Sequence, residues 1–323
     1  TDEASGTDVE LDGLDLKIDE IARDETGRLS LDGDFHAARL RLGRIELTDL
    51  EGPVSAQGNS YRVEALGGRL YGSAVEGHLN IDLEGEHPAW TLHLEAAGLS
   101  LAELFESLAG RTMFEGRVLL QADLREDGSG RFPDSLQGSL RMTGTDLVQH
   151  GFDLDGTIDN FRESRSLVDL TDIGFFVFAG PVGLLVSKGA DAAGMLGKGQ
   201  ADSQVIEEFV FNWTIDRGLA RVEDVALRTP ENRLAIKGTI DLSAMRYEDM
   251  TLALLNAEGC AELTERISGP VAQPVVEKTG VLGSLAGSLV GVFRQGLDIF
   301  DFRDCTPFYQ GKVAHHRSPD DTD

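Results

Sequence analysis

Long hydrophobic runs are absent from this sequence of 323 residues. The best candidate covers residues 281–293, contains two serines and then meets Arg294. A membrane-spanning helix needs about 20 apolar residues, so the sequence predicts no such helix. The acidic opening, TDEASGTDVE, does not have the pattern of a signal peptide. We therefore expect either a cytosolic protein or a chain whose export or anchor segment is missing.

Basic residues are also scarce. The chain has 29 Lys and Arg against 56 Asp and Glu, which gives a formal net charge of −27. Such a surface repels phosphate backbones and anionic headgroups at long range, which argues against nucleic acid as a partner. Proline is rare, with 9 residues, whereas glycine is abundant, with 38. This balance is typical of a folded chain with many turns.

Cysteine occurs only at Cys260 and Cys305. The two residues are either unrelated thiols or partners in a disulfide. A disulfide between them would close a loop worth up to about 4 kcal/mol in the chain-entropy model. It would also favour an oxidising compartment.

Catalytic and cofactor-binding motifs are missing as well. There is no Gly-x-Ser-x-Gly elbow and no His-Glu-x-x-His. Lys198 follows a glycine but precedes Gly199, so the segment is not a phosphate loop. The acidic segments LDGLDLKIDE and FDLDGTIDN lack the spaced ligands and final Glu of a calcium loop. We expect a non-enzymatic protein with no cofactor and no metal site, and a hydrolase with carboxylates assembled in space remains the third alternative.

Alternation of apolar and polar residues dominates what is present. In VEALGGRLYGSAVEGHLNIDL, Leu79, Ile81 and Leu83 fall on one side of a strand and the polar residues between them on the other. Similar segments begin at glycines with irregular spacing, which disfavours a solenoid or propeller and favours an antiparallel meander. The glycines are expected at turns, bulges or bends. These segments begin at Gly116, Gly138, Gly156 and Gly238, and EDGSG (126–130) and DRG (216–218) are predicted turns.

Three helices are predicted. Ser100 and Glu103 form a capping-box pattern that begins a helix, and Gly110 ends it. A second helix is predicted near ADAAGMLG, and a third over residues 281–300, where leucines and phenylalanines share one face. The third is expected to cap the sheet, or alternatively to contact a membrane or partner.

Several segments, in this order, resemble the C-terminal region of the AsmA family. They are VEALGGRLYGSAVEGHLNIDL, AGLSLAELFESLAG, FEGRVLLQADLREDGSG, SLQGSLRMTGTDLVQHGFDLDGTI, VEDVALRTPENRLAIKGTIDL and GCAELTERISGPVAQP. The resemblance covers roughly residues 47–311. It implies a periplasmic protein, anchored in the inner membrane by an N-terminal helix missing here, with a role in outer-membrane lipid homeostasis. Relatives include bridge-like lipid carriers whose curved sheet forms a groove that is apolar on its concave side.

The expected fold is therefore mainly β: a curved, elongated antiparallel sheet that forms a groove, with a few helices including a C-terminal one. Residues 1–46 are expected to be strands that continue a larger sheet, and residues 47–259 an AsmA-like β-rich domain. Residues 260–311 are expected to form a helical cap held by the Cys260–Cys305 disulfide, and residues 312–323 a disordered tail.

A sheet with one apolar face must cover that face with protein or with a ligand. The leading hypothesis is a periplasmic protein of envelope biogenesis that holds or transfers phospholipid or other acyl chains along the groove. The alternative is a scaffold that binds other envelope proteins through its sheet edges. The residues 173–186 read as a strand buried on both sides or as a lipid-facing wall. Candidate groove residues, which would otherwise be ordinary core, are Leu79, Ile81, Leu92, Leu94, Val118, Leu120, Leu140, Met142, Phe175, Val177, Leu234, Ile236, Ile240, Leu252 and Leu254.

Overall fold

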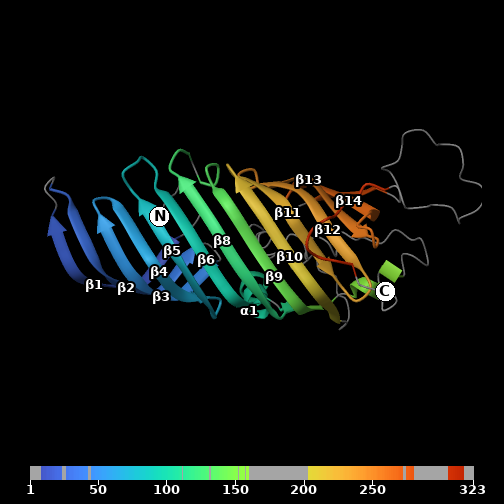
Figure 1. Ribbon diagram of the computed structural model, residues 1–323, viewed down its shortest axis with the longest axis horizontal. Helices are drawn as coiled ribbons and strands as arrows, with labels where there is room; N and C mark the ends of the chain where they lie inside the picture. Colours follow the sequence, from blue (N-terminus) through green and yellow to red (C-terminus); the bar gives the residue numbers. More distant parts are fainter. Residues whose placement is uncertain are drawn as a thin grey trace, which may run out of the picture.

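One antiparallel sheet of 15 strands makes up nearly all of the described structure (Figure 1). The computed structural model describes residues 9–23, 27–42, 45–110, 112–130, 132–151, 153–156, 158–159, 203–271, 274–279 and 305–315. The strands are β1 (Val9–Arg23), β2 (Leu29–Leu42), β3 (Ile45–Gln57), β4 (Ser60–Leu70), β5 (Ser73–Asp82), β6 (Ala89–Ser100), β7 (Phe114–Glu115), β8 (Arg117–Asp127), β9 (Gln137–His150), β10 (Ser203–Asp216), β11 (Leu219–Arg228), β12 (Arg233–Asp241), β13 (Arg246–Leu255), β14 (Ala261–Pro270) and β15 (Val275–Thr279).

Neighbours in the chain are neighbours in the sheet. The strands lie side by side in chain order, from β1 at the blue end to β15 at the other, and only the short β7 is off this path, pairing with β9 (Figure 1). At about 4.8 Å per strand, the sheet extends roughly 60 Å across its strands. The sheet is open, because within the described residues β1 pairs only with β2 and β15 only with β14. The predicted mainly-β, antiparallel meander is confirmed.

Tight hairpins join several of the strands. Between β10 and β11, Arg217 and Gly218 have φ values of 47° and 74°. Tyr71 and Gly72, between β4 and β5, also have positive φ values, 46° and 77°. Positive φ at both central residues is the type I′ turn that matches the twist of the flanking strands. The turn predicted at DRG is confirmed.

Two of the predicted glycine positions show why no side chain is tolerated there. Gly138 has φ 136°, and a Cβ atom on it would collide with the carbonyl oxygen of Asp123 on β8. Gly238 lies at a register shift between β12 and β13, with φ 137°, against Met250. The strand predicted from Gly156 is wrong, because residues 154–156 and 158–159 are helical.

Helix α1 (Leu101–Ala109) begins and ends where the sequence predicts. The Ser100 side chain accepts a hydrogen bond from the Glu103 backbone N–H at 3.4 Å, and Gly110 ends the helix with φ 70°. In a complete capping box the Glu103 side chain would accept a hydrogen bond from the Ser100 N–H. Here that N–H donates instead to the Ser73 hydroxyl at 3.0 Å.

Helix α1 packs against the sheet through its apolar side. Leu104 and Phe105 are buried in the main hydrophobic cluster, where the rings of Phe105 and Phe114 lie 4.9 Å apart. The helices predicted near ADAAGMLG and over residues 281–300 lie outside the described residues. No helix among the described residues is both long enough and apolar enough to cross a membrane.

Candidate functional site

The candidate site is the face of the sheet that carries the main hydrophobic cluster, here called the apolar face; the opposite side is the outer face. Paired strands place their apolar residues opposite one another in rows that run across the sheet. Leu79 on β5 pairs with Leu92 on β6, which pairs with Leu124 on β8. Because side chains alternate along a strand, each such pairing keeps the apolar residues of both strands on the same face.

A parallel row continues into the C-terminal half of the sheet. Leu120 pairs with Met142, Met142 with Phe211 and Phe211 with Val225. The row continues through Ile236 to Leu252. Through these two rows the apolar face extends from β5 to β13.

All predicted groove residues within the described part of the chain lie on the apolar face. They are Leu79, Ile81, Leu92, Leu94, Val118, Leu120, Leu140, Met142, Leu234, Ile236, Ile240, Leu252 and Leu254. Phe175 and Val177 lie outside the described residues.

Burial divides the apolar face into two parts. Leu234, Ile236, Ile240, Leu252 and Leu254, in the C-terminal half, each expose 3% or less of their surface. These five residues are ordinary core in the folded protein, so no ligand reaches them without a rearrangement. Val118 and Met142 are as deeply buried.

In the N-terminal half the same face is more open. Leu79, Ile81 and Leu92 are half-buried. The exposure is greatest on β1 and β2, where it ranges from 45% for Ile18 to 63% for Ile21. The exposed apolar side chains at this end of the face are Leu11, Leu14, Leu16, Ile18, Ile21 and Leu29. An exposed apolar patch of this kind marks an interaction surface.

The sequence carried a signal for this patch. The segment LDGLDLKIDEI, which suggested a failed calcium loop, is strand β1, with Leu and Ile on the apolar face and acidic residues on the outer face. Its alternation of period two predicts the strand. It does not predict that the apolar side stays exposed, because exposure depends on what packs there.

An aromatic ladder on β10 was also missed. Phe209, Phe211 and Trp213 lie at alternate positions on the apolar face, with ring centroids 6.3 Å and 5.6 Å apart. All three are buried. Alternation in the segment FVFNW is the signal that would have found them.

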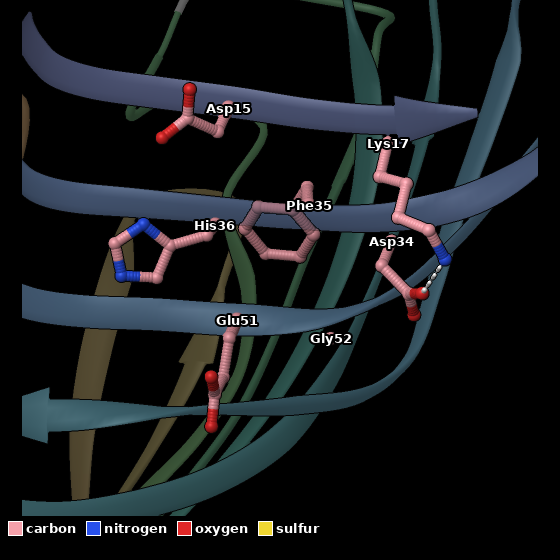
Figure 2. Close-up of a pocket in the computed structure, with 7 residues that line it drawn as sticks. All are labelled: Asp15, Lys17, Asp34, Phe35, His36, Glu51 and Gly52. Atoms are coloured by element: carbon pink, nitrogen blue, oxygen red, sulfur yellow. Dashed lines mark ion pairs between the residues drawn. The ribbon is translucent and has the colours of Figure 1, made fainter.

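Charged residues line the outer face of the same strands (Figure 2). A depression of about 350 Å³ there is lined by Asp15, Lys17, Asp34, His36 and Glu51, together with Phe35 and Gly52. Lys17 lies 2.9 Å from Asp19 and 3.9 Å from Asp34, and these carboxylates raise the pKa of Lys17. This lining is unsuited to acyl chains.

A second depression, of about 710 Å³, lies between α1 and the turn from β4 to β5. Glu46, Glu103 and Glu106 line it, with Arg41 among them. Charged side chains border this depression as they do the first, so the apolar face itself remains the stronger candidate for a lipid.

A buried polar network holds the helical residues 154–156 at the end of the sheet. The Asp155 carboxylate accepts hydrogen bonds from the Thr229 hydroxyl at 2.5 Å and from the Asn232 side-chain amide at 2.6 Å. Its other oxygen accepts from the Gln204 amide at 2.9 Å. The three partners come from the start of β10 and from the turn between β11 and β12, so the network ties these elements together.

The outer face of the C-terminal half is covered by residues 305–315, here called the strap. Cys305 is disulfide-bonded to Cys260, with Cα atoms 6.2 Å apart. Alanines on neighbouring strands leave room for the strap, and Tyr309 and Val313 fill it. The outer-face residues beneath are Val210, Ala226, Ala235, Ala253 and Leu255.

Arg233 fixes the strap from below. Its guanidinium donates to the Val313 carbonyl at 3.2 Å and to the Asn256 carbonyl at 2.8 Å. Burial lowers the pKa of this guanidinium. The arginine therefore ties the strap to the loop that follows β13 through their backbone carbonyl groups.

Metal-ligating residues do not gather within the described ranges, where no three His, Cys, Asp or Glu side chains are placed to hold an ion. His78 and His93 stack on the outer face with ring centroids 5.0 Å apart, and His93 Nδ1 lies 2.6 Å from Asp123 Oδ1.

The fold and its one-sided core define a protein with a long, open antiparallel sheet whose apolar face is covered at one end and exposed at the other. The family model described as "AsmA family" matches residues 2–225, and the chain belongs to that family. The matched range, residues 2–225, begins earlier in the chain than the range predicted from the resemblance, residues 47–311, and it also ends earlier. The comparison with curated proteins found no match, and neither did the comparison with solved structures.

Proposed function

We propose that this chain is a non-enzymatic protein of envelope biogenesis that holds or transfers lipid acyl chains on its apolar face. The observation that carries the proposal is the exposed apolar patch on β1 and β2, which shares its face with half-buried residues on β5 and β6; the buried residues of β3 and β4 lie between them. Membership of the AsmA family supports a role in the envelope.

Acyl chains fit this surface energetically. Each CH₂ group withdrawn from water contributes about 0.8 kcal/mol. The patch offers Leu and Ile side chains, and the charges of β1 and β2 lie on the outer face except Arg23, which pairs with Leu29 at the end of β1. The C-terminal half, already covered, serves as the rigid end of the sheet.

The proposed location is the periplasm, with the protein anchored to the inner membrane. The Cys260–Cys305 disulfide supports an oxidising compartment. Protease protection of the tagged full-length protein in intact and in outer-membrane-permeabilised cells tests the location. Protection that persists after permeabilisation would contradict it.

Native mass spectrometry of the purified chain tests the lipid proposal. Co-purified phospholipid, or saturable uptake of a fluorescent fatty acyl probe, is the expected result. Protein that carries no lipid and takes up no probe would refute it.

A scaffold function is the second candidate, favoured by the free edge of β1. This strand is 15 residues long and pairs only with β2 within the described residues. An unpaired strand edge is a template for β-strand addition. Two results together would favour the scaffold. The purified chain would carry no lipid, and it would bind a partner protein that the Asp15→Pro variant no longer binds.

A further inference from the structure

Two buried acidic residues of the described strands, Glu126 and Glu265, occupy positions on the apolar face. Alternation along β8 places Val118, Leu120, Ala122 and Leu124 on this face, and the next position in the series is Glu126. Its cross-strand neighbour on β6 is Trp90, which pairs in turn with Ile81 on β5. Glu126 therefore lies at the end of an apolar row, near the rim of the sheet.

The Glu126 carboxylate is buried without a hydrogen-bond partner. The residue exposes 6% of its surface, and both carboxylate oxygens are inaccessible and accept no hydrogen bond. Burial of a carboxylate without a donor is costly, and such groups in native proteins require an explanation. Glu265, the other buried glutamate on this face, differs because it does interact within the chain.

A further unsatisfied oxygen belongs to the loop that follows. The Ser135 hydroxyl, between β8 and β9, is buried and makes no hydrogen bond. The end of the β8–β9 hairpin thus presents three oxygen atoms that lack partners, two on Glu126 and one on Ser135. A ligand that fits both the unsatisfied oxygens and the apolar face needs a hydrogen-bond donor joined to an apolar group.

We propose that Glu126, once a local rearrangement at the rim of the sheet uncovers its carboxylate, binds the primary ammonium group of a lipid headgroup whose acyl chains lie on the apolar face. This inference rests on the proposed lipid-binding function and adds a headgroup preference to it. A carboxylate only accepts hydrogen bonds, and its charge-assisted bonds to ammonium groups are among the strongest in proteins. The Trp90 side chain, opposite Glu126 on the same face, adds an aromatic ring of the kind that attracts cations.

The charge of the whole chain favours the same ligand. With a net charge of −27, the protein repels anionic headgroups at long range. An ethanolamine headgroup is zwitterionic and brings its own donor, whereas a glycerol headgroup is anionic and brings no cation. The protein should therefore select ethanolamine lipids over glycerol lipids that have the same acyl chains.

The test is a competition. The purified chain is incubated with vesicles that contain equal amounts of ethanolamine and glycerol phospholipids with identical chains, and bound lipid is counted by native mass spectrometry. The wild type should be enriched in the ethanolamine lipid, and Glu126→Gln should lower this enrichment roughly tenfold, as expected for one lost hydrogen bond to a charged group. Total bound lipid should change little, because the acyl chains remain bound.

Glu76→Gln is the matched control, since it removes one negative charge from an exposed position on the outer face of β5. It should leave the enrichment unchanged. If Glu126→Gln binds lipid with the enrichment of the wild type, the inference is wrong while the proposed function stands. If the wild type binds no lipid, both fail.

A comparison that uses only the wild type keeps the test valid if the variant does not fold. Choline lipids carry a cation without an N–H group, so a hydrogen bond from a primary ammonium group predicts weaker binding of choline than of ethanolamine lipid. Equal binding of the two lipids would overturn the inference.

Discussion

The Tyr309 hydroxyl donates a hydrogen bond to Asp224 Oδ1 over 2.6 Å, which joins the strap to strand β11 on the outer face. The same hydroxyl accepts a hydrogen bond from the Val313 N–H at 3.1 Å, and Asp224 Oδ2 accepts one from the Lys312 N–H at 3.1 Å. One hydroxyl and one carboxylate therefore join Tyr309, Lys312 and Val313 of the strap to β11.

Removal of this hydroxyl should loosen the strap. Tyr309→Phe keeps the ring in its apolar site but leaves Asp224 and the Val313 N–H without their partner. The free energy of unfolding should fall by about 1–3 kcal/mol, as measured by urea denaturation. Phe308→Leu, on a neighbouring, partly buried ring, is the comparison for lost packing alone. A Tyr309→Phe variant as stable as the wild type would show that the hydroxyl contributes nothing.

Stability should fall in alkaline solution. Burial, and next the hydrogen bond to Asp224, raise the pKa of Tyr309 above its ordinary value, and burial does the same for Tyr247. The raised pKa favours the neutral phenol in the folded state, so this contribution is complete below the unfolded pKa of about 10. It is lost as pH rises from there towards the folded pKa. Denaturation at pH 8 to 11 should show the decline, with a shallower slope for Tyr309→Phe; equal slopes would contradict this role.

The disulfide should stabilise the fold by constraining the unfolded chain. Cys260→Ser with Cys305→Ser opens a loop with a sequence separation of 45 residues. The expected loss is up to about 4 kcal/mol in the free energy of unfolding. Reductant should destabilise the wild type and leave the double variant unaffected. A wild type indifferent to reductant under denaturing conditions would contradict the prediction.

The Asp155 network should be essential to the end of the sheet. Asp155→Ala removes the buried carboxylate that accepts hydrogen bonds from the side chains of Gln204, Thr229 and Asn232. The free energy of unfolding should fall by about 3 kcal/mol. Glu86→Ala, in the exposed loop between β5 and β6, serves as the control and should change it by less than about 0.5 kcal/mol. Similar effects of the two substitutions would argue against a structural role for the network.

A charge on the exposed patch should block lipid without unfolding the protein. Leu16 is 50% exposed on the apolar face, so Leu16→Glu meets water in the free protein but would lie against acyl chains in the complex. Uptake of a fluorescent acyl probe should fall several-fold, with an unchanged melting temperature. His36→Glu places the same charge on the outer face of the adjacent strand and should bind the probe normally. Normal uptake by Leu16→Glu would exclude the patch as the lipid site.

Much of the fold was predictable because its signals are local. Alternation of period two in the segment around Leu79 and Ile81 determines which side chains share a face, whatever the rest of the chain does. Ser100 and Gly110 bound helix α1 through hydrogen bonds and backbone angles within a few residues of each end. The strand expected at Gly156 failed because Asp155 engages Thr229 and Asn232, contacts that lie more than 70 residues away in the chain.

The sequence by itself determined the strands, the two-sided character of the sheet and the residues of its apolar face, because each depends on spacing along the chain. Tertiary structure alone decided that Leu234 is covered while Leu16 is exposed, although both follow the same alternating pattern. It also decided that the strap packs on the outer face and that Glu126 is left without a donor. Burial depends on which distant segments meet, and no pattern within one strand records that.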